Sequence, residues 1–169
     1  MNNNKSISKY SKILHPKNWP SHLEYINIMK YPKTIPKKLF IKNVKIKCIE
    51  NKNHICYGQY GLYANYKIEK YDVLGEYTGY VTNTGGRYVA GFKNLDYTNN
   101  YGIDAENSGN ELRFINDYRN IGIKPNTILK NSFIDKRPKI LVIATENINE
   151  DEEILLDYGK GYYNCFIKK

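Results

Sequence analysis

The stretch Gly109–Asn120, which reads GNELRFINDYRN, constrains the fold of this chain more than any other segment. It sets the apolar residues Leu112, Phe114 and Ile115 directly beside charged and amide side chains such as Arg113. Leaving a buried polar group without a partner costs about 1–3 kcal/mol. The stretch therefore predicts a buried polar node, in which these side chains are held by hydrogen bonds to other parts of the chain.

Length and charge limit the organisation of the protein. A chain of 169 residues suits one domain with a real core. We expect that domain over residues 41–169, preceded by a basic N-terminal arm or flanking segment over residues 1–40. The formal net charge of +9 is compatible with a solvated lysine-rich surface. It is equally compatible with contact to an acidic partner such as nucleic acid through the basic N-terminal region.

Cysteine and histidine placement argues against metal binding and against several catalytic classes. The three cysteines have no metal-ligand spacing, which favours free thiols in a reducing compartment. The histidines lie in the first third of the chain, away from the motif-rich region, so a hydrolase triad is not expected and His22 is expected to be solvated. No apolar run is long enough for a membrane span, and the start has no apolar signal region. We expect a soluble intracellular protein with no membrane partner.

Short segments with strand-like patterns recur between turn residues, which predicts a mostly β domain of the α+β class. Gly85-Gly86 indicates a hairpin turn, and Gly79 would allow close backbone approach. Lys136–Pro138 would connect a further strand pair. The expected strands are 44–50, 58–64, 71–81, 87–92, 101–105, 127–135, 139–145 and 153–159.

Four motifs occur together in a characteristic order: Tyr60-Gly61-Leu62, Glu76-Tyr77-Thr78-Gly79, Arg113–Asn116 and Glu153–Gly159. With these motifs the chain resembles SET-domain protein lysine methyltransferases. The resemblance runs from about residue 44 to residue 163. It indicates a compact member without the zinc-binding pre-SET and post-SET modules, since there is no cysteine cluster on either side.

The resemblance implies a β-clip-like SET fold, in which small sheets surround a C-terminal pseudoknot. Asp157-Tyr158-Gly159 would pass under the loop that carries Arg113–Tyr118, and GNELRFINDYRN would be a strand of that knot. S-adenosylmethionine, released as S-adenosylhomocysteine, would lie on one face, and the target lysine would enter from the other. The implied function is S-adenosylmethionine-dependent protein-lysine N-methylation of a histone or another basic protein. Chromatin and the nucleus are the compartment that this function implies.

The same resemblance assigns residues to the site. Tyr158 would orient the lysine amine as the main catalytic residue, and Tyr77 would line the lysine path. A dry channel and the sulfonium charge disfavour the ammonium form of lysine. Catalysis therefore depends more on the alignment of the reacting atoms than on a strong base. The residues expected at the cofactor are Tyr60, Gly61, Leu62, Tyr88, Arg113, Phe114, Asn116 and Asp117, and those expected at the substrate are Leu156, Tyr162 and Tyr163. At Gly61 the missing Cβ would let the backbone approach the ligand.

Three positions depart from the usual family pattern. Gln59 stands where a glycine is usual, Asp117 where histidine is usual, and Leu156 where many members carry an aromatic residue that limits methylation. Gln59 and Asp117 leave open a catalytically silent binding module on the SET fold. The net charge and the tyrosine content leave open a basic nucleic-acid-binding protein with stacking tyrosines. The substrate lysine, the degree of methylation and the oligomeric state also stay open, and a homodimer is compatible with so compact a chain.

Overall fold

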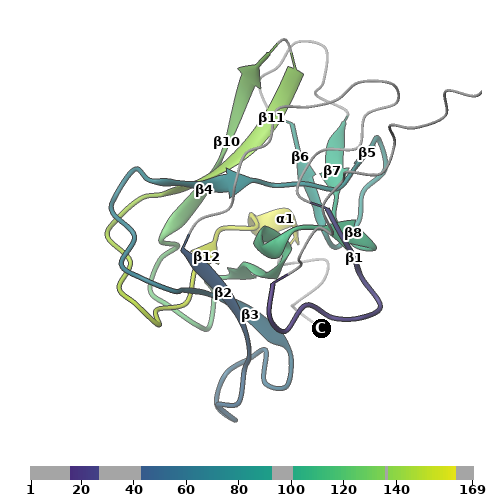
Figure 1. The fold of residues 1–169 in the computed structure, drawn as a ribbon. Helices are drawn as coiled ribbons and strands as arrows, with labels where there is room; N and C mark the ends of the chain where they lie inside the picture. The colour runs from purple at the N-terminus through teal and green to yellow at the C-terminus, as the bar shows by residue number, and fades with distance from the viewer. Residues whose placement is uncertain (1–15, 27–42, 93–100, 136, 163–169) are drawn as a thin grey trace, which may run out of the picture.

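The computed structural model describes residues 16–26, 43–92, 101–135 and 137–162. Over these residues the chain is built from short strands with very little helix (Figure 1). The strands are β1 (Glu24–Tyr25), β2 (Val44–Cys48), β3 (Tyr60–Ala64), β4 (Val73–Glu76), β5 (Tyr80–Thr82), β6 (Val89–Gly91), β7 (Gly102–Asp104), β8 (Ser108–Gly109), β9 (Asn116–Asp117), β10 (Thr127–Ile134), β11 (Arg137–Ala144) and β12 (Leu155–Leu156). The helical segments are the 3-10 helix η1 (Glu111–Phe114) and α1 (Lys160–Tyr162).

These strands form several small sheets in place of one large sheet, as the sequence pattern predicts. The sheet orders are β1-β8, β10-β11-β4, β12-β9, β2-β3 and β5-β7-β6. In Figure 1 the sheets lie around a centre that holds η1, β12 and α1. Within the described ranges, no helix has the length and apolar content needed to cross a membrane.

One expected hairpin is confirmed and another is wrong. β10 and β11 pair antiparallel from Thr127 opposite Ala144 to Ile134 opposite Arg137. β5 and β6, however, do not pair with each other across the Gly85-Gly86 turn, because β7 lies between them and pairs with both. A glycine pair indicates only a local turn. The strand that separates β5 from β6 is β7, which follows later in the sequence and cannot be predicted from the turn.

Gly79 permits the approach of β5 to β7 that the sequence predicted. A Cβ placed on Gly79 would lie 2.1 Å from the carbonyl oxygen of Asp104 and 3.0 Å from the side chain of Ile103. Backbone atoms cannot yield at such a distance. The glycine is therefore required by the protein's own packing at the start of β5.

The stretch that reads GNELRFINDYRN is the buried polar node that its composition predicts, but it is not one continuous strand. Its first half is η1, in which every residue is buried, and its second half contains the two-residue β9. Asn110 caps η1, since its Oδ1 accepts the N–H of Leu112 at 3.3 Å while its Nδ2 donates to the carbonyl of Glu76 at 2.7 Å. The guanidinium of Arg113 donates to the carbonyls of Ala105 and Glu106 at 2.8 and 3.1 Å.

β9 and β12 form the pairing that joins the middle of the chain to its C-terminal part. They run parallel, with Leu155 opposite Asn116 and Leu156 opposite Asp117. Asn126 supports β12 from the side, because its Nδ2 donates to the carbonyl of Glu153 and its Oδ1 accepts the N–H of Leu155, both at 2.8 Å. These contacts fix the chain immediately before residue 158.

The described part of the N-terminal segment packs on the rest of the domain. Trp19 is only 9% exposed and meets the rings of Tyr25 and Phe114 edge-on, at centroid distances of 4.9 and 5.5 Å. β1 pairs in parallel with β8, and Thr78 donates its hydroxyl to the carbonyl of Ile26 at 2.8 Å. Residues 1–15 and 27–42 of the expected basic arm lie outside the described residues.

We predict that Asn126→Ala destabilises the fold strongly. The change leaves the Glu153 carbonyl and the Leu155 N–H buried without their partner, at a cost of about 1–3 kcal/mol for each group. Urea unfolding followed by circular dichroism measures the loss. Asn147→Ala is the matched control, because exposed Asn147 makes one hydrogen bond, to the N–H of Lys70, and should cost about 1 kcal/mol. Equal losses in the two variants would contradict the role of Asn126.

Candidate functional site

Two cavities meet at the centre of the molecule. One, here called the cleft, has a volume of about 550 Å³, and the other, here called the groove, has a volume of about 440 Å³. Both are lined by Arg87, Tyr88, Tyr158 and Tyr162. A ligand in the cleft and a ligand in the groove would therefore both contact this small set of side chains.

The cleft collects most of the residues that the sequence assigned to a cofactor. Tyr60, Tyr88, Arg113, Phe114, Asn116 and Asp117 all line it. The lining of the cleft includes both arginines and apolar side chains. Such a mixed lining suits a ligand that has both a charged end and a flat apolar part.

Gly61 and Leu62 do not line either cavity. Leu62 is fully buried, and its carbonyl accepts the N–H of Ile154 at 2.8 Å. A Cβ on Gly61 would lie 2.9 Å from Oε1 of Glu153 and 3.0 Å from Cε2 of Tyr63. The glycine therefore makes room for side chains of the protein itself, which differs from the ligand approach expected from the sequence.

Glu153 is the centre of a polar cluster behind the cleft that the sequence reasoning missed. Its Oε1 accepts from Nδ2 of Asn116 at 2.9 Å, and its Oε2 lies 3.0 Å from Nε2 of His54. Burial, together with the charge and hydrogen bond of Glu153, raises the pKa of Tyr63 to about 12. No local pattern could reveal this cluster, because His54 and Glu153 are 99 positions apart.

The tyrosines expected to be catalytic stand where the groove reaches the cleft. The buried hydroxyl of Tyr77 donates to the carbonyl of Tyr88 at 2.9 Å, and the hydroxyl of Tyr158 donates to the carbonyl of Ile115. The rings of Tyr158 and Tyr162 meet edge-on at 4.7 Å. Burial raises the pKa of both Tyr77 and Tyr158 above the usual value for tyrosine, so both phenols keep their protons near neutral pH.

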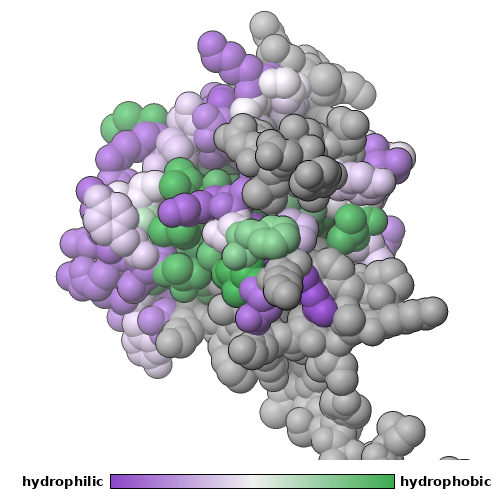
Figure 2. All heavy atoms as spheres, turned by 90° about the horizontal axis from the view of Figure 1, so that it is seen from above, coloured by the Kyte–Doolittle hydropathy of each residue, from purple (hydrophilic) through white to green (hydrophobic). Residues whose placement is uncertain are grey.

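The groove lies between the edges of two sheets. β6 stands at the end of the order β5-β7-β6, and β10 stands at the end of β10-β11-β4. The groove is lined by residues of both strands and, at its inner end, by buried Leu156. On the face seen from above in Figure 2, apolar side chains gather near the middle among polar ones. Tyr163, the remaining expected substrate residue, lies outside the described residues.

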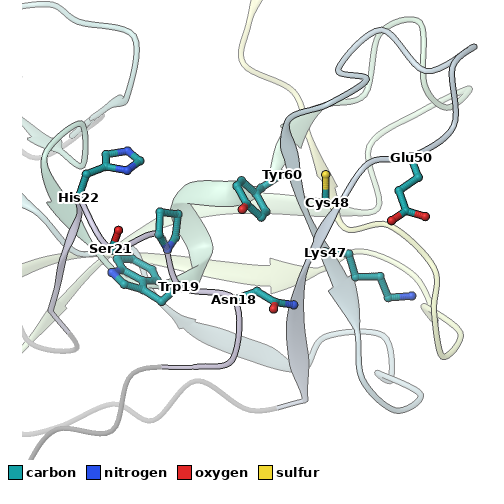
Figure 3. Close-up of a pocket in the computed structure, with 9 residues that line it drawn as sticks. Asn18, Trp19, Ser21, His22, Lys47, Cys48, Glu50 and Tyr60 are labelled. Carbon is teal, nitrogen blue, oxygen red and sulfur yellow. The ribbon is translucent and has the colours of Figure 1, made fainter.

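A third cavity, of about 800 Å³, lies beside the cleft, with which it shares Pro20, His22 and Tyr60. Figure 3 shows it between the N-terminal residues Trp19, Ser21 and His22 on one side and strand β2 with Lys47 on the other, with Tyr60 between them. None of the tyrosines at residues 77, 88, 158 and 162 lines it. Its volume exceeds that of the cleft, but of the residues that the sequence assigned to a site only Tyr60 lines it.

Several residues line the cleft that the sequence reasoning did not place there. They include Pro20, His22 and Leu23 from the N-terminal segment, and Ile55, Cys56, Arg87 and Arg119 from loops. His22 is exposed, as expected, but at the rim of the cleft. Within the described part of the chain, no group of three His, Cys, Asp or Glu side chains could hold a metal ion.

Comparison with known proteins matches a model of the SET domain to residues 59–159 of this chain. The histone-lysine N-methyltransferase EZA1 of Arabidopsis thaliana is 28% identical over 110 residues, which cover 60% of this chain and 12% of the relative. An active polycomb repressive complex 2 in the stimulated state contains a chain with a TM-score of 0.58 and 24% identity, covering 75% of this chain and 16% of that one. A humanized mutant of the Chaetomium thermophilum complex, bound to an inhibitor, gives a TM-score of 0.56 and 22% identity, covering 74% and 16%.

These similarities confirm the mostly β SET fold that the motifs predict. This chain spans less than a fifth of the length of each of these similar proteins. The similarity therefore shows the fold of this chain and does not assign to it the activities of the longer proteins.

We predict that Gly61→Ala destabilises the chain without any ligand present. The new methyl group would press on Glu153 and Tyr63, and such overpacking costs about 1–3 kcal/mol. Gly85→Ala is the matched control, since a Cβ there meets nothing within 4 Å. Thermal unfolding of the ligand-free variants measures the difference. If Gly61→Ala is as stable as Gly85→Ala, the close packing at Gly61 is refuted and the ligand-approach interpretation returns.

Proposed function

Because this chain belongs to the SET-domain family, we propose that it is an S-adenosylmethionine-dependent protein-lysine N-methyltransferase. The observation that carries the proposal is the meeting of the cleft and the groove at Tyr88, Tyr158 and Tyr162. A transfer from a bound cofactor to a protein substrate needs two approaches that converge on one point. A binding module would need one approach only.

The cleft fits the proposed cofactor in size and in lining. Its volume of about 550 Å³ lies within the usual range of about 300–1,000 Å³ for small-molecule sites. Arg113 and the amide of Asn116 would hold polar parts of the cofactor, and Phe114 and Tyr60 would cover its apolar part. When bound, S-adenosylmethionine supplies an activated methyl group, and the remaining chemistry is positioning by this chain.

The groove suits an extended peptide. Strands at sheet edges carry unpaired N–H and C=O groups along one side, and an added peptide strand can pair with them. Both β6 and β10 present lining residues to this space, so a peptide lying between them would have a sheet edge on each side. A lysine of that peptide would extend its apolar stem toward Tyr77 and Tyr158, with Leu156 beside it.

Tyr158 is proposed to orient the substrate amine without acting as a base. Its hydroxyl already donates a hydrogen bond to the Ile115 carbonyl. The lone pairs of the hydroxyl oxygen therefore remain to accept an N–H of the amine. The nitrogen lone pair is then directed away from the tyrosine and toward the cleft. Deprotonating a lysine near neutral pH costs about 4 kcal/mol, and the proton is proposed to leave to water before the amine enters the channel.

A histone or another basic protein is the proposed substrate, and the nucleus is the proposed compartment. Support comes from the name of the Arabidopsis thaliana relative. The net charge of +9 gives no long-range attraction to a basic tail. Selectivity would therefore depend on contacts in the groove, since it is charge complementarity that steers partners over distance.

A catalytically silent binding module is the second candidate, and Gln59 and Asp117 favour it because both depart from the usual family pattern. Calorimetric titration of the folded chain with S-adenosylmethionine separates the candidates. Binding supports the proposed enzyme, and absence of binding supports the silent module.

We predict that Tyr158→Phe lowers methyl transfer by about a hundredfold, the scale expected when a reacting group loses its alignment. The variant keeps the ring that packs on Tyr162 and removes the hydroxyl that meets the Ile115 carbonyl. Transfer is measured by mass spectrometry of histone and whole-lysate acceptors incubated with S-adenosylmethionine, which also reports the degree of methylation. Tyr66→Phe is the control, since Tyr66 is 61% exposed and does not line the described cavities. No transfer by the unmodified chain, or equal transfer by the Tyr158→Phe variant, would refute the mechanism.

The pH dependence gives a separate prediction. Since kcat/KM reports free enzyme and free substrate, it should rise about tenfold per pH unit from pH 7 to 9, as the free lysine with its pKa of about 10.4 loses its proton. Burial raises the pKa of Tyr158 well above its usual value, so Tyr158 stays protonated across this range and adds no falling limb. Initial rates at each pH measure the profile. A fall in kcat/KM between pH 7 and 9 would show that a protonated lysine or an ionising tyrosine controls the reaction.

A further inference from the structure

The ion pair between Asp117 and Arg119 occupies the position at which this chain departs from the family's histidine. We propose that this pair is a positioning device that holds the backbone on both sides of Tyr158 and thereby aims its hydroxyl. The inference rests on the proposed function for its kinetic consequence. Its structural content is independent of activity.

Asp117 uses both of its carboxylate oxygens within the protein. Oδ2 accepts the backbone N–H of Tyr158 at 2.8 Å and a guanidinium N–H of Arg119 at 2.7 Å. Oδ1 accepts the backbone N–H and a guanidinium N–H of Arg119, both at 3.0 Å. A side chain so fully engaged acts on Tyr158 from within the protein. Its carboxylate is therefore assigned a positioning role and not a cofactor contact.

Arg119 extends the contact to the other side of Tyr158. Its second terminal nitrogen donates to Oδ1 of Asp157 at 2.6 Å, and the same oxygen accepts the backbone N–H of Gly159 at 2.7 Å. One guanidinium thus ties together the two carboxylates that hold the N–H groups of Tyr158 and Gly159. The planar fork of arginine suits this double contact, whereas the single ammonium of lysine cannot reproduce it.

The phenol of Tyr158 completes the restraint. Its hydroxyl donates to the carbonyl of Ile115, which lies two residues before Asp117 on the same segment. The backbone amide and the hydroxyl of Tyr158 are therefore both bound to residues 115–117. Because Asp117 is buried and its side chain is only 4% exposed, its charge requires this arginine partner, and removing either partner loosens the same tyrosine.

The test uses Asp117→Asn, Arg119→Met and Arg119→Lys in the full chain. Asp117→Asn keeps the shape of the side chain. It replaces the two charged oxygens, which accept N–H groups, by one neutral oxygen and one NH₂ group that is itself a donor. Arg119→Met keeps length and removes the charge. We expect kcat to fall by roughly ten- to a hundredfold in both, the scale of a misaligned reacting group. KM for S-adenosylmethionine and its calorimetric affinity should change less than about threefold, since the lost contacts are intramolecular.

Arg119→Lys is the conservative rescue, and it should recover part of the kcat lost in Arg119→Met because it restores one charged contact. Glu69→Gln is the matched control. It breaks the exposed Lys67–Glu69 pair, which has the same two-residue spacing and an N–O distance of 2.8 Å. It should leave kcat unchanged. Unfolding curves for all four variants show whether the protein assayed is folded.

Hydrogen exchange of the Tyr158 amide, measured by nuclear magnetic resonance on ¹⁵N-tyrosine protein, gives a readout that needs no activity. Tyr158→Phe assigns the resonance. Exchange should be roughly tenfold faster in Asp117→Asn, because the N–H of Tyr158 loses its charged acceptor, and also faster in Arg119→Met, because that acceptor loses the guanidinium that holds it. It should be unchanged in Glu69→Gln. Inactivity of the unmodified chain would overturn the proposed function, while faster exchange would still support the restraint. Unchanged exchange, or an affinity loss in place of a kcat loss, would overturn the inference.

Discussion

The parallel pairing of β9 with β12 is the contact on which the rest of the site depends. Two residues on each side pair, which is too short to be stable by itself. Asn126 and Thr127 add side-chain hydrogen bonds to the backbone of β12, from Asn126 to Glu153 and Leu155 and from Thr127 to Leu155. Because β12 directly precedes Tyr158, these bonds determine where that tyrosine stands relative to β9.

Most buried polar side chains of the described residues have a hydrogen-bond partner, although Oε1 of Glu76 and Oε2 of Glu111 have none. Arg113 donates from Nε and from one terminal nitrogen to the carbonyls of Ala105 and Glu106, and its guanidinium carbon lies 4.4 Å from the centre of the Tyr88 ring. Lys139 pairs with Glu76 at 2.8 Å, each only 3% exposed. Removing two charges from water is costly and is repaid only where the geometry is good. The site is therefore built on groups that tolerate little displacement.

Tyrosine is abundant in this chain, with 17 copies, and the structure gives several of them a shared role. Tyr88, Tyr158 and Tyr162 line both cavities, and Tyr77 lines the groove beside them. Burial raises the pKa of Tyr77, Tyr158 and Tyr162, so these phenols act as neutral hydrogen-bonding groups. A site of this kind can align an amine and exclude water, but it offers no ionised tyrosine as a base. The tyrosines that line the site are therefore suited to aligning a bound group and not to acting as a strong base.

The sequence by itself determined the family, the mostly β class and the burial of most of GNELRFINDYRN, because each of these is written in local motifs. It also named six of the residues that line the cleft as cofactor residues, namely Tyr60, Tyr88, Arg113, Phe114, Asn116 and Asp117. Only the tertiary structure decided what Gly61, His54 and Glu153 do. It also decided that β7 separates β5 from β6, and that Asp117 faces Arg119 and the amide of Tyr158. These contacts join residues far apart in the chain or depend on the direction in which a side chain points. A motif records which residues are present, whereas hydrogen-bond partners are chosen by the packing that brings distant backbone and side-chain atoms within reach.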